Sequence, residues 1–421
     1  ALLPLITRDP SHPTPADFGV GYANYNTLSG SFYGTTGLTE TVAADFAASY
    51  AKQHDGWGRN LTTNEDVNTR SDYQFRSKLR WTPTVDLSVE FSADYSYIKS
   101  NVSVARAAAP DSILPGNKLI DGFGLLPGQS IYDSRADIPA DDQNVRAKQY
   151  GYSLKARLDG TPLGDFQSLT AFRWIRSSAV FDQDGTGLRA GLNLAAQPGR
   201  APADAVNSPL AAWLVDFTKM WQQEFLLNST IGKLDLTTGV FLYYSEGRFN
   251  PIGLTSNALS RGPITVTRYS YNRQITRSYA AFTQGAYHFT DKLTASVGLR
   301  ITRDERDASG KNLWVQSGPG LPPVGAVTSS LPATKTNPVT GAVTPFTQAD
   351  ANRNFNKLTY RIALDYKITP DTMVYASQSR GFKSGVFNMT SIGPAVEPEV
   401  LDSTAIGFKS DLFDRTVRLN V

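Results

Sequence analysis

Side chains that could carry catalytic chemistry are scarce in this 421-residue sequence, which contains no cysteine and three histidines. The lack of cysteine removes thiol nucleophiles, disulfides and cysteine metal sites from consideration. His12 and His54 fall in predicted connecting segments, and His288 falls beside a predicted tight turn. His54 next to Asp55 is a weak candidate for a hydrolase pair. Because lone loop histidines are more often solvated residues than bases or ligands, we predict no catalytic residue and no enzyme.

Metal and cofactor sites are equally hard to assemble. Four acidic residues gather in one predicted loop, at Asp133, Asp137, Asp141 and Asp142. Their carboxylates could bind a divalent cation, but charges in a loop more often remain solvated. No phosphate-binding glycine motif or metal-ligand spacing stands out. We therefore predict no metal and no cofactor.

The charge distribution argues against nucleic acid as a partner. The 41 basic and 38 acidic residues are mixed along the chain and give a net charge of +3. Domains that bind nucleic acid normally concentrate basic residues in a patch or stripe. The sequence shows no such stripe.

Alternating apolar and polar residues dominate the chain and predict strands. The clearest example is segment 79–97, where this alternation continues on both sides of a turn at 82–86. A period of two residues is the pattern of a strand. We predict about fifteen strands, which begin near residues 17, 27, 40, 71, 85, 146, 166, 215, 234, 274, 292, 355, 372, 399 and 415.

Tight turns and long loops alternate between these strands. The tight turns fall near 37–40, 82–86, 160–165, 232–234, 289–292, 368–371 and 413–415. The long loops fall near 54–71, 100–145, 183–213, 249–273, 307–353 and 384–398. A soluble sandwich has no reason to place its long loops at one end, because both ends face the same solvent. A transmembrane barrel does sort its connections in this way.

Composition agrees with a membrane barrel. The hydrophobic fraction is 40% and the mean hydropathy is −0.29, so no run of about 18 apolar residues exists that would cross a bilayer as a helix. A barrel needs no such run, since only alternate strand residues meet lipid. The predicted fold class is all-β, an antiparallel transmembrane β-barrel. A soluble β-sheet stabilised by cross-strand aromatic pairs is the alternative.

Charges on the polar face of the strands have two interpretations. If Lys78 pairs with Glu90 in the 79–97 hairpin, then Arg76, Lys78 and Arg80 face a strand that carries Glu90 and Asp94. Such ladders mainly hold strand register. A basic stripe facing the lumen would instead steer an anionic solute. The local balance of charge favours the structural role.

Several segments resemble TonB-dependent outer-membrane receptors and span nearly the whole chain. They are LITRDP (5–10), FGVGYANYNTL (18–28), DGWGRNLTT (55–63), QQEFLL (222–227), VGLRITRDE (297–305), YASQSRGFKSG (375–385), PE (398–399), IGFKS (406–410) and LFD (412–414). The resemblance implies a barrel in the bacterial outer membrane, with its tight turns in the periplasm and its long loops outside the cell. Family barrels have about 22 strands. The chain therefore resembles a barrel with about fifteen strands of an expected 22.

The sequence also departs from the family pattern. The signal peptide, the TonB box and the globular plug of the family have no counterpart here, and the chain ends within a predicted strand. We expect residues 1–16 to be the end of a plug with its junction, and residues 17–421 to be an incomplete barrel, truncated at both ends. Unpaired strand edges in hydrocarbon are costly, so the segment alone is not expected to work as a receptor.

Three function classes follow from these features. The resemblance implies an importer of a scarce solute, such as a ferric siderophore, a cobalamin or an oligosaccharide. Its partners would be outer-membrane lipid and the TonB complex, which acts through the missing plug and TonB box. The alternatives are a passive porin of 14 or 16 strands, which needs no plug, and a soluble surface adhesin.

The resemblance places solute contacts on lumen-facing residues near the outer rim and in the long loops. The candidates where a strand rises into an outer loop are Gln378, Arg380 and Lys383, and the loop candidates are Trp57, Phe123, Tyr132 and Trp314. For any one of them, strand register or loop packing is the commoner role.

Overall fold

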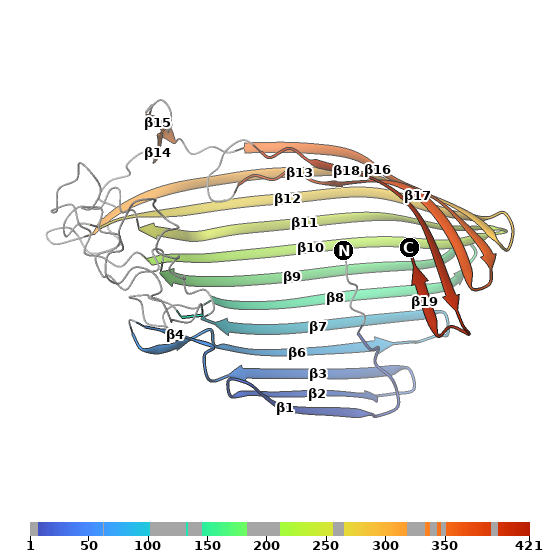
Figure 1. Cartoon of the computed structure of the whole chain (residues 1–421), viewed down its shortest axis with the longest axis horizontal. Coiled ribbons are helices and arrows are strands. Elements are labelled where there is room, and N and C mark those ends of the chain that lie inside the picture. The colour runs from blue at the N-terminus through green and yellow to red at the C-terminus, as the bar shows by residue number, and fades with distance from the viewer. Residues whose placement is uncertain are drawn as a thin grey trace.

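Most of the chain forms one long β-sheet in the computed structural model of the protein (Figure 1). The structure describes residues 7–61, 63–101, 132–133, 145–182, 211–255, 265–317, 333–336, 343–346, 351–388 and 395–421. Within them, fifteen strands pair in one sheet in chain order, and each strand is antiparallel to its neighbours. The described residues contain no helix long and apolar enough to cross a membrane.

The strands of this sheet lengthen from the N-terminal edge toward its centre. Their bounds are β1 (Ala16–Ala23), β2 (Thr27–Gly37), β3 (Val42–Gln53), β6 (Arg70–Trp81), β7 (Leu87–Ser100), β8 (Val145–Thr161), β9 (Gly164–Asp182), β10 (Ala211–Ile231), β11 (Leu234–Thr255), β12 (Thr265–His288), β13 (Leu293–Ser317), β16 (Ala351–Thr369), β17 (Thr372–Lys383), β18 (Glu399–Leu412) and β19 (Val417–Asn420). Two small hairpins lie in the long connections: β4 (Gly58–Asn60) with β5 (Glu65–Val67), and β14 (Ala333–Thr336) with β15 (Val343–Phe346).

The predicted sorting of connections is confirmed. Tight turns lie at one end of the sheet, on the right of Figure 1, and the strand ends that the longer connections join lie at the other end. One short turn, between β1 and β2, lies at the long-loop end, where Tyr25 and Asn26 have positive φ angles of 60° and 50°. The Asp55 amide donates to the Tyr25 carbonyl over 3.1 Å, which ties this turn to the next connection.

Most strands begin within a few residues of the predicted positions. The largest difference is β12, which begins at Thr265 rather than near 274. β12 and β13 pair continuously from His288 with Thr294 up to Thr265 with Ser317, so pairing continues where the sequence pattern predicted a loop. The four short strands in the connections were not predicted, because three or four residues carry too little alternation to be recognised.

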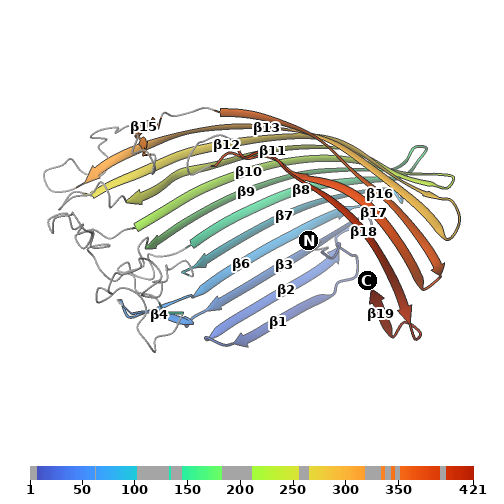
Figure 2. The same ribbon diagram turned by 45° about the horizontal axis from the view of Figure 1, so that its top comes forward.

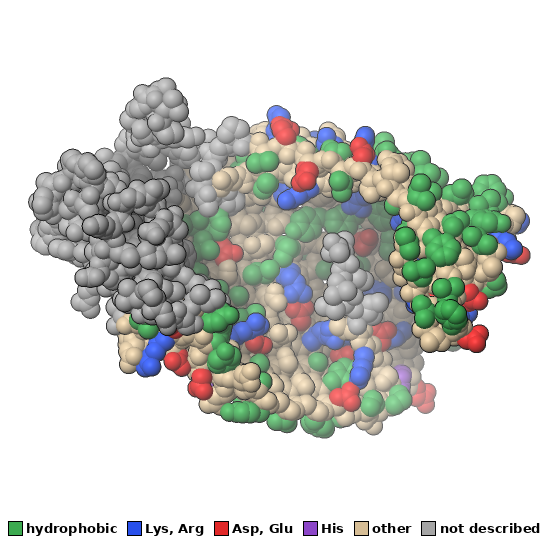
Figure 3. Space-filling view, in the orientation of Figure 1, with side chains coloured by type: hydrophobic (Ala, Val, Ile, Leu, Met, Phe, Trp, Pro, Cys, Tyr) green, Lys and Arg blue, Asp and Glu red, His purple; other side chains and the backbone are tan. Residues whose placement is uncertain are grey.

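The two faces of the sheet differ in polarity. Large apolar side chains on the outer face are exposed, such as Ile301 (61%), Leu358 (58%) and Ile362 (53%). Polar side chains on the inner face are buried, such as Asp45 (4%) and Asp304 (6%). Figures 2 and 3 show that the sheet curls around a hollow whose wall carries charged side chains. This arrangement is the reverse of a soluble protein and fits an outer face that meets lipid.

The pairing of Lys78 with Glu90 that was considered above differs from the observed register by two residues. Lys78 lies opposite Ser92, and Arg80 lies opposite Glu90. β7 pairs with β8 from Leu87 onward but pairs with β6 only from Val89, which lengthens the connection on the β6 side. Lys78 still reaches Glu90 diagonally, with 3.5 Å between Nζ and Oε1.

Two glycines at tight turns differ in how much space surrounds them. Gly164 has a φ of 123°, and an added Cβ would lie 2.1 Å from the Asn228 carbonyl oxygen. Gly232 has a φ of 62° with no heavy atom within 4 Å of an added Cβ. We expect Gly164→Ala to lower the free energy of unfolding by about 3 kcal/mol and Gly232→Ala by about 1 kcal/mol. Urea unfolding of both variants in detergent measures the difference, and equal losses would contradict the close contact at Gly164.

Candidate functional site

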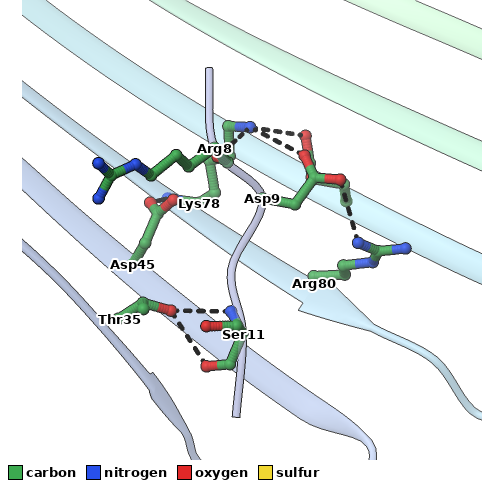
Figure 4. A network of polar contacts seen from close by, with 8 residues as sticks. Arg8, Asp9, Ser11, Thr35, Asp45, Lys78 and Arg80 are labelled. Carbon is green, nitrogen blue, oxygen red and sulfur yellow. Dashed lines mark hydrogen bonds and ion pairs between the residues drawn. The ribbon is translucent and has the colours of Figure 1, made fainter. Parts of the chain in front are cut away.

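The N-terminal segment 7–15 crosses the inner face of β2, β3 and β6 (Figure 4). The Ser11 amide donates to Thr35 Oγ1 over 2.8 Å, and Thr35 Oγ1 donates back to the Ser11 carbonyl over 3.1 Å. The Gly37 amide donates to the His12 carbonyl over 3.1 Å. The segment is thereby bound to the inner wall by backbone and side-chain hydrogen bonds.

Ionic contacts also bind segment 7–15 to the inner wall. Lys78 Nζ donates to the Arg8 carbonyl over 3.1 Å and lies 3.5 Å from a carboxylate oxygen of Asp9. Arg80 Nη1 lies 3.1 Å from the other Asp9 oxygen. The Lys78 side chain is only 7% exposed, and its backbone amide donates to Asp45 Oδ1 over 2.8 Å. Lys78 is therefore the centre of the contact between the segment and the wall.

A second inner-face feature is a group of three cations on β13 and β16, which we term the basic wall cluster: Arg300, Lys357 and Arg361. Register places Arg300 opposite Thr359, so Lys357 and Arg361 are its two diagonal neighbours on the same face. Arg300 Nε donates to Thr302 Oγ1 over 3.2 Å, and its guanidinium lies 5.4 Å from the Phe282 ring centroid. Among the described residues, none of the three forms an ion pair with a carboxylate.

The connection after β17 folds over the wall on the loop side of this cluster. Val386 and Val396 form a β-bridge. Phe387 is 4% exposed, and its amide donates to Gln274 Oε1 on β12 over 3.2 Å. Glu397 pairs with Arg353 of β16 over 2.8 Å. The cluster therefore lies on the inner wall between this covering segment and the tight turns.

The three strand candidates fall on different faces. Gln378 lies opposite Ile362, and Arg380 lies opposite Tyr360, so both share the outer, apolar face. Arg380 forms a bidentate ion pair with Asp402 at 2.7 and 2.8 Å, and Gln378 accepts a hydrogen bond from Thr404. These contacts join β17 to β18. Lys383 lies on the inner face opposite Glu399.

Two of the loop candidates, Trp57 and Tyr132, come together although 74 residues lie between them in the sequence. The rings of Trp57 and Tyr132 meet edge to face at 5.0 Å between centroids. Around them, the Asn68 side chain donates to the Tyr132 carbonyl over 3.2 Å, and the Arg59 amide donates to Asp133 over 2.9 Å. Phe123 lies outside the described residues. Trp314 on β13 pairs through its backbone with Arg268 on β12, and its side chain is not among the described ones.

The loop end also contains a polar cleft of about 420 Å³. Its lining includes Lys52, His54, Glu65, Arg70 and Lys99. The cleft is of a size that admits a small solute, and both signs of charge border it.

The structure gives the three histidines ordinary hydrogen-bond partners. His12 Nε2 lies 3.0 Å from the Thr39 carbonyl, and His54 Nδ1 lies 2.9 Å from the Asn26 carbonyl. His288 Nε2 lies 2.9 Å from Asp235. Within the part of the chain that the structure describes, no group of three or more His, Cys, Asp or Glu side chains is placed to hold a metal. Asp137, Asp141 and Asp142 lie outside that part.

Sequence reasoning did not single out the basic wall cluster. The alternation places Arg300 and Arg361 on the polar faces of their strands, but it does not show which residues oppose them. Only the register between β13 and β16 shows that no carboxylate partner lies opposite these cations.

Comparisons with known proteins agree with this architecture. The family model described as "TonB dependent receptor-like, beta-barrel" matches residues 6–421. The ferric yersiniabactin uptake receptor FyuA from Yersinia pestis is similar, with 13% identity and a TM-score of 0.63 over 96% of this chain and 53% of that chain. The siderophore receptor PiuA from Acinetobacter baumannii has 12% identity and a TM-score of 0.66 over 98% and 57%. The copper transporter OprC has 11% identity and a TM-score of 0.60 over 96% and 52%. The chain spans about half the length of these solved structures.

Proposed function

The chain belongs to the TonB-dependent receptor family of the bacterial outer membrane, and we propose that it forms the barrel wall of an importer whose solute is an anionic metal chelate such as a ferric siderophore. Its tight turns face the periplasm and its long loops face outward. The energy for import would come from the TonB complex, acting through a plug inside the barrel. Membership in this family favours the receptor over the passive porin and the adhesin.

The observation that carries the choice of solute is the basic wall cluster. Arg300, Lys357 and Arg361 point into one region of the inner face, and no described carboxylate lies within ion-pair distance of them. Like charges this close repel one another unless an anion or water screens them. An anionic chelate would supply the missing negative charge, whereas a neutral cobalamin or oligosaccharide would not.

Residues 1–16 would connect this wall to the plug, with the barrel beginning at residue 17. The support is the binding of segment 7–15 to the inner face through Thr35, Lys78 and Arg80. A chain held inside the wall at this position leads naturally into a domain within the lumen.

The proposed solute path combines the loop end and the inner wall. Trp57 and Tyr132 offer an aromatic pair at the outer mouth, and Lys383 lies on the inner face near the end of β17. The basic wall cluster lies deeper. Gln378 and Arg380 are left out of this path, because their outer-face position and their contacts with Thr404 and Asp402 give them a role in strand pairing.

Uptake by cells that produce the complete receptor tests this proposal. We expect an anionic ferric chelate to accumulate only in cells with a functional TonB complex, and a neutral ferric chelate of similar size to accumulate about tenfold less, in keeping with loss of one charged contact. Equal uptake of the two chelates would contradict the anionic solute. Uptake that continues without TonB would instead support a passive channel.

A further inference from the structure

An ion pair between Arg353 and Glu397 lies at the loop end of the basic wall cluster. Arg353 shares the inner face of β16 with Lys357 and Arg361, because even spacing along a strand keeps side chains on one side. Glu397 belongs to the covering segment, which connects β17 to β18, and its Oε1 lies 2.8 Å from Arg353 Nη2. Among the described residues, Glu397 is the single carboxylate that pairs with any of these three cations.

The facing strand adds a further cation at the same level. Arg306 on β13 lies directly opposite Arg353, and directly opposed like charges destabilise a strand pair. Arg306 Nη1 donates to Thr276 Oγ1 over 2.5 Å, whereas its buried Nε has no hydrogen-bond partner among the described atoms. Asp304 is the next residue on this face and is 6% exposed, but no described ion pair joins it to either arginine. The region is therefore short of anions, and Glu397 supplies one.

The covering segment is closed on itself and bound to the wall by contacts other than this ion pair. Val386 and Val396 exchange two backbone hydrogen bonds, of 3.3 and 2.9 Å. The Phe387 side chain is buried, and its amide donates to Gln274 Oε1 over 3.2 Å. None of these contacts involves a charged side chain. Removing the charge of Glu397 should therefore leave the segment in place.

The ion pair is accessible from the lumen. The side chains of Arg353 and Glu397 are 54% and 68% exposed. Exposed pairs contribute little to stability, because water screens the charges and two long side chains must be held in one geometry. A pair of this kind opens readily, so an anion that enters the lumen can take the place of Glu397 at Arg353.

We propose that Glu397 is a resident anion that competes with the transported solute for Arg353. This role rests on the anionic solute proposed above and narrows its class to chelates with several anionic groups. A small anion must displace Glu397 through a single contact. A chelate that is already bound to Lys357, about 13 Å along the strand, presents its next anionic group to Arg353 at a high effective concentration. Glu397 therefore reserves Arg353 for polyanionic solutes.

Binding of two ferric chelates to the complete receptor in detergent tests this role. The probes are a ferric tris-catecholate, which is strongly negative, and a ferric tris-hydroxamate, which is uncharged. Glu397→Gln keeps the size of the side chain and removes its charge. We expect the dissociation constant for the tris-catecholate to fall about fivefold, as for a site that is blocked about four-fifths of the time and becomes free. The constant for the tris-hydroxamate should stay within about twofold of the wild type.

The matched control is Glu305→Gln, which removes a carboxylate from an outer-face pair with Arg303 on β13. It should change neither constant by more than about twofold. Unchanged or weaker binding of the tris-catecholate to Glu397→Gln would overturn the proposed competition, since the pair would then serve only the fold. An equal gain for both chelates would also overturn it, because loosening of the segment would explain that result without any competition for charge.

A double-mutant cycle locates the competition at Arg353. In an Arg353→Gln background, Glu397→Gln should have no further effect on the binding of the tris-catecholate, because the competition requires both side chains. A gain of about fivefold that persists in this background would reveal a long-range effect of charge and would overturn the proposal.

Failure of the proposed function gives a different result. If the wild type binds the two chelates equally, the anionic solute and the competition by Glu397 are both overturned. If the wild type prefers the tris-catecholate and loses that preference when the basic wall cluster is replaced by glutamine, the anionic solute is supported. In that case an unchanged affinity of Glu397→Gln overturns the competition alone.

Discussion

Replacing Arg300, Lys357 and Arg361 together by glutamine is expected to weaken binding of an anionic ferric chelate by about 100-fold. The three cations share one region of the inner wall and have no described carboxylate partner, so their charge is available to a solute. Each lost hydrogen bond to a charged group costs about 1.5–3 kcal/mol of binding free energy. Even if only two of the three cations reach the solute, about 3 kcal/mol would be lost, which corresponds to about 100-fold in affinity. Titration of the purified complete receptor with the chelate measures the constant.

The control for this triple variant lies three residues away on the same strand. Arg303 faces outward and pairs with Glu305 at 3.0 Å, so Arg303→Gln removes one charge from β13 without changing the inner wall. Its affinity for the chelate should remain within about twofold of the wild type. A neutral chelate should bind the triple variant as well as it binds the wild type. If both chelates lose affinity equally, the cluster supports the wall and does not select for charge.

Lys78→Ala is expected to destabilise the protein by about 2 kcal/mol more than Asp9→Ala. Lys78 is 7% exposed and contacts the Arg8 carbonyl, Asp9 and Glu90, whereas the Asp9 side chain is 59% exposed. Breaking a buried ion pair costs about 3–5 kcal/mol. Because Asp9 is exposed, its replacement by alanine should cost less than this. Truncating the buried lysine also leaves Glu90 without this cation. Urea unfolding of the two variants gives the difference.

The same substitution should release the N-terminal segment from the wall. Residues 1–421 contain no cysteine, so Ser11→Cys provides one reactive thiol in this chain. Ser11 is bound to Thr35 through its backbone, and the cysteine keeps those hydrogen bonds. We expect a maleimide to react with this thiol about tenfold faster when Lys78→Ala is added, since about 1.4 kcal/mol of restraint corresponds to that factor. An unchanged rate would mean that the hydrogen bonds to Thr35 hold the segment without Lys78.

Local sequence patterns were enough to predict the strands and the sorting of their connections. Alternation over ten or more residues, as in segment 79–97, depends on neighbours along the chain and can be read without a structure. Turn residues such as Gly160 and Asp165 mark the ends of strands in the same way. These signals are local, and they are repeated in almost every hairpin of the sheet.

Register and face were less predictable, because they depend on contacts between strands. The Lys78 and Glu90 pairing differed by two residues, since β7 begins to pair with β8 before it pairs with β6. The side of the sheet on which Gln378 and Arg380 lie could not be predicted, for a related reason. The end of β17 has polar residues on both faces, and only pairing with Tyr360 and Ile362 of β16 assigns it.

Contacts between distant loops could not be predicted at all. Trp57 and Tyr132 were chosen separately as aromatic loop residues, and nothing in the spacing of the two predicts that their rings meet. The same holds for the basic wall cluster, whose members become a cluster only through the pairing of β13 with β16.

The increase in strand length across the sheet makes the mouth of the described wall oblique. β1 has 8 residues, whereas β12 has 24 and β13 has 25. Because about 9–11 tilted residues cross the hydrocarbon, more than half of β12 and β13 extends beyond it. The wall therefore stands tall on one side of the mouth and low beside β1 to β3. Among the described strands, the rim at the long-loop end therefore slopes down from β13 to β1.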